Sequence, residues 1–183
     1  MKIAFGYKMG VGKDEAVSYI RRKIDGRQIS FAGPLYSIMF YAQEVCGFEK
    51  QKDRQFLQYV GTEWAREKDP DIWVRLAIEN ASRMLGNLFL TDLRFPNEFE
   101  ALKNDGWLCV KINRSSTEGR EGSGKKSHHS EKALDLVHDN RWDYIIDNNG
   151  TLEEFYKKLD ILILKINEQQ KQQQDIWHGA IRI

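Results

Sequence analysis

The residues with the clearest capacity for chemistry lie near the N-terminus, in the segment Phe5-Gly6-Tyr7-Lys8-Met9-Gly10-Val11-Gly12-Lys13-Asp14. An apolar run typical of a strand (residues 2–5) precedes it, and a run with helical spacing (residues 15–23) follows it. In that context, a glycine-containing turn presents successive backbone N–H groups to an anion, and the helix N-terminus adds partial positive charge. Lys13 adds a point charge for the β- and γ-phosphates of a nucleotide. The segment therefore predicts a phosphate-binding loop.

The loop departs from the pattern G-x-x-x-x-G-K-[ST] at two positions. Tyr7 stands where the pattern has its first glycine, and the nearest glycine is one residue earlier, at Gly6. Asp14 stands where the pattern has Ser or Thr. A carboxylate is the kind of oxygen ligand that Mg²⁺ prefers, so Asp14 is predicted to lie at a magnesium site. The alternatives are that Asp14 only caps the helix and that the glycine-rich turn is purely structural.

The loop fixes which groups we expect around the phosphates of ATP. The glycine-containing turn would supply backbone N–H groups, Lys13 would supply its ammonium, and the first turn of the helix would supply two further amides. The predicted ATP-binding residues of the loop are Gly10, Val11, Gly12, Lys13, Asp14 and Glu15.

The elements that must position this loop are short strands and longer helices in alternation. This order indicates βαβ units and a parallel sheet, so the fold class is α/β. The strands are nearly all apolar, which is typical of strands covered on both faces. Strands are predicted over residues 2–5, 28–31, 88–91, 108–112 and 144–146, and helices over residues 15–23, 35–45, 52–66, 70–84, 97–104 and 151–166.

Composition limits the class of protein further. The chain has 183 residues, which predicts a single domain over residues 1–183. It is 41% hydrophobic and 30% charged, which excludes a wholly disordered chain, and its net charge of +1 gives no support to binding of nucleic acid. No apolar run is long enough for a membrane span. The two cysteines lack metal-ligand spacing, which favours a reducing, cytoplasmic compartment.

Several segments together resemble the deoxynucleoside monophosphate kinases of bacteriophages and large DNA viruses, within the nucleotide kinase branch of the P-loop proteins. The resemblance spans residues 3–160 approximately, and its most specific parts are the loop with GKD, the GTEW segment and the TDLRFPNE segment. The segments in chain order are Gly12–Asp14, Ser30–Leu35, Leu57–Arg66, Asp71–Val74, Thr91–Glu98, His129–Glu131 and Asp147–Leu152.

The resemblance implies a three-layer P-loop nucleotide kinase fold: a five-stranded parallel sheet flanked by helices, with a small lid. It implies a monophosphate-binding region over about residues 31–84 and a lid over about residues 114–130. The implied reaction transfers the γ-phosphoryl group of ATP, with Mg²⁺, to a deoxynucleoside monophosphate (dNMP), giving ADP and a dNDP. The implied partners are small-molecule nucleotides, with no nucleic acid and no membrane.

The apolar tail residues Trp177, Ile181 and Ile183 could form a homodimer contact or an intramolecular one.

The remaining candidates follow from where ligands bind in open α/β sheets, just outside the carboxyl ends of the strands. Asp92 follows the predicted strand 88–91 and is expected to hold a metal-bound water or accept from the substrate. The alternative for Asp92 is a strand-end turn residue paired with Arg94. The planar fork of arginine matches phosphate oxygens, so the candidates for the acceptor phosphate are Arg54, Arg66, Arg75 and Arg94. Arg66 ranks high because it follows GTEWA, which resembles a family motif, and Arg94 ranks beside it because it follows Asp92 at the strand end.

A lid should bring positive charge to the transferring group as it closes, which makes Arg114 and Arg120 the predicted lid residues. The predicted catalytic set is therefore Lys13, Asp92, Arg94, Arg114 and Arg120. A base needs a flat apolar wall, and Phe31, Tyr36, Trp64 and Trp73 are its candidates, although core packing is the default role of any one aromatic.

The segment Asn148-Asn149-Gly150-Thr151 resembles the loop beside adenine in similar kinases, which makes Asn148 and Gly150 predicted ATP-binding residues. A turn with Thr151 capping the last helix can hold at the same time.

Two other functions stay open at this point. A small-metabolite kinase of the phosphomevalonate type shares the GKD loop but would need no pocket for a base. The aromatic content of 11% favours a nucleotide. A nucleotide-binding module without turnover would be consistent with the departure at Tyr7.

Overall fold

The computed structural model describes residues 1–115 and 133–180, with only the backbone for residues 173–174 and 176–180. Its strands form one parallel sheet in the order β2-β3-β1-β4-β5. The five predicted strands are confirmed, with ends that differ by a residue or two, and so is the α/β fold class. The bounds are β1 Lys2–Gly6, β2 Arg27–Ile29, β3 Leu88–Leu93, β4 Leu108–Asn113 and β5 Tyr144–Asp147.

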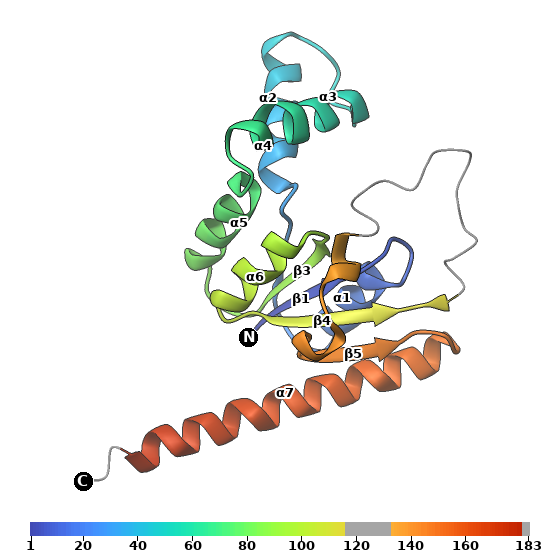
Figure 1. Cartoon of the computed structure of the whole chain (residues 1–183), viewed down its shortest axis with the longest axis vertical. Helices are drawn as coiled ribbons and strands as arrows, with labels where there is room; N and C mark the ends of the chain where they lie inside the picture. Colours follow the sequence, from blue (N-terminus) through green and yellow to red (C-terminus); the bar gives the residue numbers. More distant parts are fainter. Residues whose placement is uncertain (116–132, 181–183) are drawn as a thin grey trace.

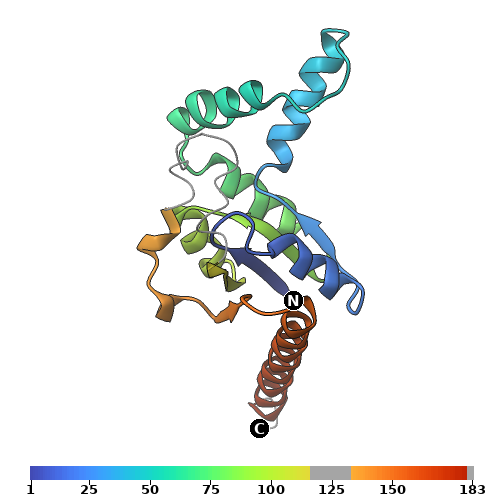
Figure 2. The ribbon, with the colours of Figure 1, turned by 90° about the vertical axis from the view of Figure 1, so that its right-hand side faces the viewer.

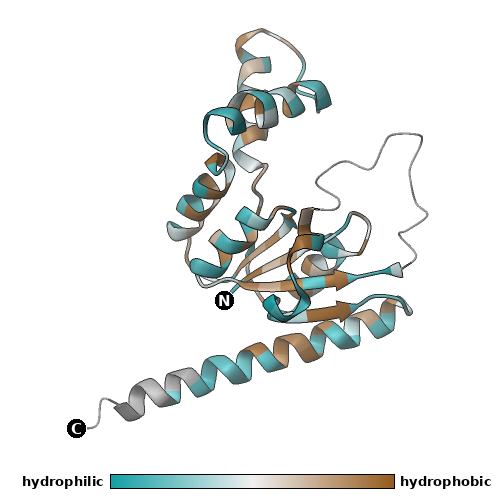
Figure 3. Ribbon diagram, in the orientation of Figure 1, coloured by the Kyte–Doolittle hydropathy of each residue, from teal (hydrophilic) through white to brown (hydrophobic). Residues whose placement is uncertain are grey.

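Helices cover both faces of the sheet and complete three layers (Figure 1). The helices α1 (Lys13–Arg21) and α7 (Leu152–Ala180) pack on one face, and α5 (Ile72–Ser82) and α6 (Pro96–Asn104) pack on the other. Side chains of a strand alternate between faces. In β1, accordingly, Ile3 and Phe5 belong to the core between the sheet and the helices α1 and α7. Ala4, between them, belongs to the core between the sheet and the helices α5 and α6. Figure 3 shows the resulting apolar colouring of the strands.

A second group of helices projects from the sheet as an arm, seen at the top of Figures 1 and 2. The arm consists of α2 (Gly33–Val45), α3 (Arg54–Gln58), the π-helix η1 (Tyr59–Trp64) and α4 (Ala65–Lys68). The segment predicted as helical, residues 52–66, is helical from Arg54 onward, but a π-helix replaces the α-helix over Tyr59–Trp64. Gly61, within the π-helix, is tied to α5 and has no room for a side chain. Its carbonyl accepts the indole N–H of Trp73 at 2.9 Å, and a Cβ at this position would lie 2.8 Å from Leu35 Cδ2.

The C-terminal helix begins as predicted and ends later. The Thr151 N–H donates to Glu154 Oε2 at 2.8 Å, and the Glu154 N–H donates to Thr151 Oγ1 at 3.2 Å, so Thr151 caps the helix as predicted and forms a capping box with Glu154. The helix continues past the predicted end at Ile166 to Ala180 through a run of Gln, Lys and Glu, which are good helix formers. Of the two alternatives for the Gln-rich stretch 168–175, a helix extension or a frayed tail, the structure shows the extension. The side chains of Trp177, Ile181 and Ile183, the predicted contacts of the tail, lie outside the described residues.

Two short 3₁₀ helices, η4 (Ala133–Leu136) and η5 (Asp139–Arg141), lead into β5. Among the residues that the structure describes, no helix combines the length and the apolar character that crossing a membrane requires.

Candidate active site

The phosphate-binding loop joins β1, at the centre of the sheet, to α1. Three of its residues have positive φ: Tyr7 at 96°, Gly10 at 76° and Gly12 at 105°. Glycine adopts this region without penalty, whereas a non-glycine residue there is strained. The departure at Tyr7 thus lies in the side chain only, since its backbone takes the conformation that glycine favours.

Packing explains why the glycine stands at position 6 instead. A Cβ on Gly6 would lie 2.6 Å from Cη2 of Trp142, so the indole ring occupies the space of a side chain. The Tyr7 ring, in turn, has two ammonium groups near it, with Lys8 Nζ at 5.1 Å and Lys111 Nζ at 4.2 Å from its centroid. These cation–π contacts offset part of the backbone strain.

The side chain of Lys13 turns back onto the backbone of the phosphate-binding loop. Its Nζ donates to the carbonyl oxygens of Tyr7 at 3.1 Å and Lys8 at 2.5 Å. The loop forms one wall of a cavity of about 320 Å³, and the carboxyl end of β3 forms another. The cavity is lined by Tyr7, Met9, Gly10, Gly12, Lys13, Asp14, Glu15, Thr91, Asp92 and Arg94. The structure therefore brings the predicted loop residues together with Asp92 and Arg94.

The loop after β5 braces the phosphate-binding loop. The Asn148 side chain is buried and donates to the Val11 carbonyl at 2.8 Å, and a Cβ on Gly12 would meet its amide nitrogen at 2.8 Å. Asn149 accepts from both the N–H and the hydroxyl of Ser115, at 2.8 and 2.7 Å, and so ties this loop to the end of β4. Gly150 lies in the same loop, directly before the capping box of α7.

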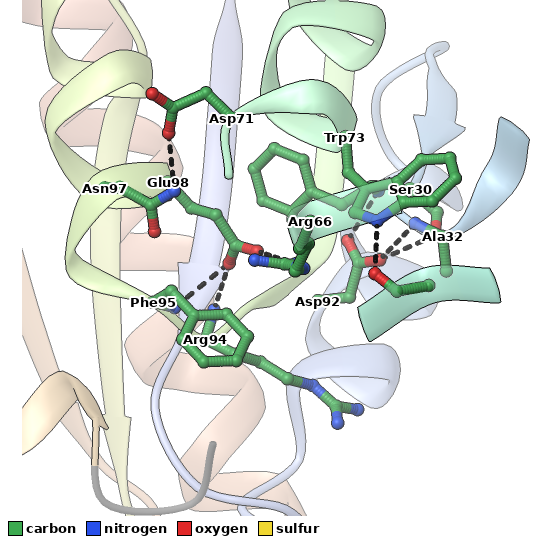
Figure 4. A network of polar contacts seen from close by, with 12 residues as sticks. Ser30, Ala32, Arg66, Asp71, Trp73, Asp92, Arg94, Phe95, Asn97 and Glu98 are labelled. Carbon is green, nitrogen blue, oxygen red and sulfur yellow. Dashed lines mark hydrogen bonds and ion pairs between the residues drawn. The ribbon is translucent and has the colours of Figure 1, made fainter. Parts of the chain in front are cut away.

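The two predicted metal carboxylates differ in their surroundings. Asp14 is exposed at the start of α1, lines the cavity, and forms no side-chain hydrogen bond or ion pair with residues 1–115 or 133–180. Asp92 uses both of its oxygens. Oδ2 accepts from the Ser30 hydroxyl at 2.6 Å and the Ala32 N–H at 3.1 Å, and Oδ1 accepts from the Phe31 N–H at 3.2 Å (Figure 4).

Asp92 thus fastens the chain between β2 and α2 to the end of β3. Two sequence expectations change as a result. The predicted second strand over residues 28–31 ends early, at Ile29, because the N–H groups of Phe31 and Ala32 turn toward this carboxylate. The alternative in which Asp92 pairs with Arg94 is wrong, since no such ion pair occurs in the part of the chain that the structure describes.

The two arginines ranked highest for the acceptor phosphate approach from different elements. Arg94, after β3, is exposed, and its guanidinium points away from Glu98 and forms no hydrogen bond or ion pair with the described residues (Figure 4). Arg66, on α4, donates from Nη2 to Glu98 Oε1 at 3.1 Å, and its guanidinium lies 4.6 Å from the centroid of the Phe95 ring.

Glu98 is a functional candidate that the sequence reasoning did not single out. Its side chain is only 2% exposed. Oε2 accepts from the backbone N–H groups of Arg94 at 2.8 Å and Phe95 at 3.0 Å. Burial raises the pKa of Glu98, and the Arg94 N–H and the Arg66 guanidinium act in the opposite direction. A signal existed in the sequence, because Pro96 at the first position of a helix and Glu98 at the third are typical of a capped N-terminus.

The four predicted aromatic residues of the base site fall into two pairs. Phe31 and Trp73 are 3% and 4% exposed and belong to the core between the sheet and α5. Trp64 is 47% exposed, with Lys68 Nζ 4.7 Å from its ring centroid. Tyr36 is half-buried beside Phe40, with ring centroids 6.0 Å apart. Only Tyr36 and Trp64 of this set offer ring surface to a ligand.

Of the predicted lid, Arg114 directly follows β4 and is half-buried. Arg120 and the rest of the lid from residue 116 onward lie outside the described residues. No group of three or more His, Cys, Asp or Glu side chains suited to a metal occurs within the described ranges.

The strand order, the positive-φ loop between β1 and α1, and the lysine at the start of α1 define a P-loop kinase fold. Solved structures agree on the fold. Shikimate kinase from Acinetobacter baumannii, in complex with shikimate, matches with a TM-score of 0.55 at 13% identity, over 90% of this chain and 93% of that one. Shikimate kinase from Aquifex aeolicus matches with a TM-score of 0.52 at 16% identity, over 92% and 99%.

The chain belongs to the deoxynucleotide monophosphate kinase family, whose sequence profile matches residues 49–159, more than half of its length. A relative in Ictalurid herpesvirus 1, the uncharacterized protein ORF77, is 38% identical over 143 residues, which cover 75% of this chain and 60% of that protein. A proposed deoxynucleotide monophosphate kinase of Acanthamoeba polyphaga mimivirus is 27% identical over 182 residues, covering 82% and 89%. The chain thus spans less than two thirds of the herpesvirus relative.

Proposed function

We propose that the protein transfers the γ-phosphoryl group of ATP to a dNMP, giving ADP and a dNDP. The observation that carries the proposal is a single cavity whose walls hold both kinds of group that this reaction needs. The phosphate-binding loop and Lys13 form the donor side, and Arg94 reaches the same cavity from the end of β3. Membership in the family supports a dNMP as the acceptor.

On the donor side, the N–H groups of the loop and the N-terminus of α1 bind the β- and γ-phosphates. Lys13 exchanges its contacts with the carbonyls of Tyr7 and Lys8 for contacts with these phosphates, which are stronger acceptors because they are charged. The buried brace from Asn148 to Val11 keeps the loop in place during the exchange.

The residues present fit a magnesium ion brought in with ATP. Mg²⁺ in such sites is held by one or two carboxylates together with substrate phosphates, so a cluster of three protein ligands is not needed. Asp14 is the exposed carboxylate of the cavity and would hold the ion, whereas the oxygens of Asp92 already accept from the chain at residues 30–32. When bound, the ion neutralises charge on the phosphate oxygens.

On the acceptor side, Arg66 and Arg94 bind the 5′-phosphate of the dNMP, and Tyr36 and Trp64 offer ring surface for its base. An oxygen of the acceptor phosphate forms the new bond to the γ-phosphorus, and the bond from that phosphorus to the β–γ bridging oxygen breaks, which releases ADP. The attacking oxygen is already ionised near neutral pH, so the step needs positioning and charge neutralisation more than a general base. Arg114 and Arg120 are proposed to add charge from the lid.

The test is an ADP-release assay with Mg-ATP and a panel of acceptors: the four common dNMPs, their ribonucleotide forms, shikimate and mevalonate 5-phosphate. Lys13→Ala should abolish turnover, because it removes the point charge on the transferred phosphate. Lys23→Ala is the matched control, since Lys23 lies just beyond α1 and pairs with Asp160 on the surface at 2.5 Å. Turnover with a metabolite alone, or ATP binding without acceptor-dependent turnover, would refute the proposal.

A further inference from the structure

Glu98 connects the arm to the body of the molecule through its two oxygens, which bind different elements. Oε1 accepts from Arg66 of α4, in the arm, and Oε2 accepts from the N–H groups of Arg94 and Phe95, in the turn after β3 (Figure 4). One carboxylate therefore fixes where the Arg66 side chain lies relative to the backbone that carries Arg94.

The surroundings make this link rigid. The Glu98 side chain is 2% exposed and that of Arg66 is 24% exposed, so water competes little for either partner. A buried carboxylate is tolerated only when it is well hydrogen-bonded, and Glu98 has three donors on its two oxygens. The Phe95 ring packs against the Arg66 guanidinium, with its centroid 4.6 Å from the guanidinium carbon.

A neighbouring contact joins α6 to the connection between α4 and α5, outside the arm itself. Asn97, beside Glu98, donates from its side-chain amide to Asp71 Oδ1 at 2.7 Å, just before α5 (Figure 4). This contact is exposed and involves no phosphate-binding candidate. Of these two contacts, only the one at Glu98 reaches the arm and holds a side chain that is proposed to touch substrate.

We propose that Glu98 is a positioning residue for the acceptor phosphate. It fixes the Arg66 guanidinium relative to the backbone that carries Arg94, so that the two arginines can act on the same phosphate, and it does so without touching the substrate. This inference rests on the proposed function, and it adds a residue that the phosphate chemistry alone does not identify.

Glu98→Gln separates this role from the capping of α6. The glutamine oxygen can still accept the N–H groups of Arg94 and Phe95, but its amide nitrogen would face the Arg66 guanidinium, placing a donor against a donor. We expect the KM for the dNMP to rise about 10- to 100-fold, because a small misplacement of a positioning group costs that much. The KM for ATP should stay unchanged, since the donor loop has no contact with Glu98.

A double-mutant cycle with Arg66→Met tests whether Glu98 acts through Arg66. If it does, the double variant should raise the KM for the dNMP no further than the larger of the two single effects. Equilibrium binding of the dNMP by calorimetry, without ATP, should show the same loss and the same lack of additivity. The control is Glu100→Gln on the same helix, whose carboxylate pairs with exposed Arg141 at 2.8 Å and which should behave as the wild type.

The possible outcomes distinguish the two proposals. A wild-type protein that neither binds nor phosphorylates any dNMP would overturn the proposed function and this inference with it. If the wild type is active, any of three results would overturn the inference alone. They are an unchanged KM for the dNMP in Glu98→Gln, a rise in the KM for the dNMP and the KM for ATP together, and effects additive with those of Arg66→Met.

Discussion

The indole N–H of Trp73, on α5, donates a 2.9 Å hydrogen bond to the carbonyl oxygen of Gly61, in the centre of the π-helix. Both groups are buried, so the bond satisfies a carbonyl in an irregular turn of backbone and ties the arm to the helix that packs on the sheet. Trp73 therefore supports the stretch of chain that leads to Arg66.

Trp73→Phe tests this bond. The variant keeps an aromatic ring and leaves the Gly61 carbonyl without its donor, which should lower the free energy of unfolding by about 1–3 kcal/mol. Urea denaturation measures the loss. Trp64→Phe is the matched control, because Trp64 is 47% exposed and its truncation should change stability by less than about 0.5 kcal/mol. Equal effects of the two substitutions would show that the bond to Gly61 contributes nothing particular.

The π-helix within residues 52–66 is a feature of the fold that the sequence alone does not predict. Helical spacing over residues 52–66 is real, and most of these residues are helical. Within the π-helix, Gly61 accepts a long-range hydrogen bond from Trp73 and has no room for a Cβ beside Leu35, and no local pattern contains either relationship. The strands and the phosphate-binding loop, in contrast, were predictable because apolar runs and loop residues are local signals.

Asp92 and Glu98 illustrate the same limit within the site. The sequence placed Asp92 correctly at the carboxyl end of β3, yet its partners at residues 30–32 are about 60 positions away and come from another strand connection. Glu98 lies in the predicted helix 97–104, and nothing in the local sequence indicates its burial or its ion pair with Arg66. Strand ends can be read from a sequence, whereas the pairing of distant side chains requires the fold.

Asp14 and Asp92 should respond differently to the same substitution. Asp92→Asn replaces one acceptor oxygen by a donor that faces N–H groups, so we expect a loss of stability of about 1–3 kcal/mol by urea denaturation. Asp14→Asn should leave stability unchanged, because the exposed Asp14 side chain has no partner among the described residues. It should instead raise the Mg²⁺ concentration that gives half-maximal turnover. An unstable Asp14→Asn variant, or an Asp92→Asn variant as stable as the wild type, would contradict this division.

The backbone of Tyr7 gives a third prediction about stability. Alanine at a positive φ is strained and glycine is not, so Tyr7→Gly should be more stable than Tyr7→Ala by about 1 kcal/mol, although both lose the ring contacts. The order should reverse at Ser37, an exposed residue within α2, where glycine is the poorer helix former by about 1 kcal/mol. Thermal unfolding of the four variants checks both signs. If alanine were preferred over glycine at position 7 as well, the positive φ would be refuted.

The buried thiol of Cys109 should make the protein less stable as the pH rises into the alkaline range. It is buried in β4, and burial, with a contribution from the charge of Asp143, raises the pKa of its thiol from 9.0 to about 12. Above the ordinary thiol pKa the unfolded chain loses this proton while the folded chain keeps it. Each further pH unit therefore favours unfolding by about 1.4 kcal/mol until the folded pKa is reached.

The corresponding measurement is urea denaturation of the wild type and of Cys109→Ala at about pH 8 and about pH 10. Cys109→Ala should be less stable at the lower pH, because it leaves a small cavity, and should lose less stability on going to the higher pH. Comparing the two proteins cancels the titration of Lys and Tyr groups common to both. Cys46→Ala is the control, because Cys46 is exposed and should leave the pH dependence unchanged. Identical pH slopes for the wild type and Cys109→Ala would show that the Cys109 thiol ionises as readily in the folded protein as in the unfolded chain.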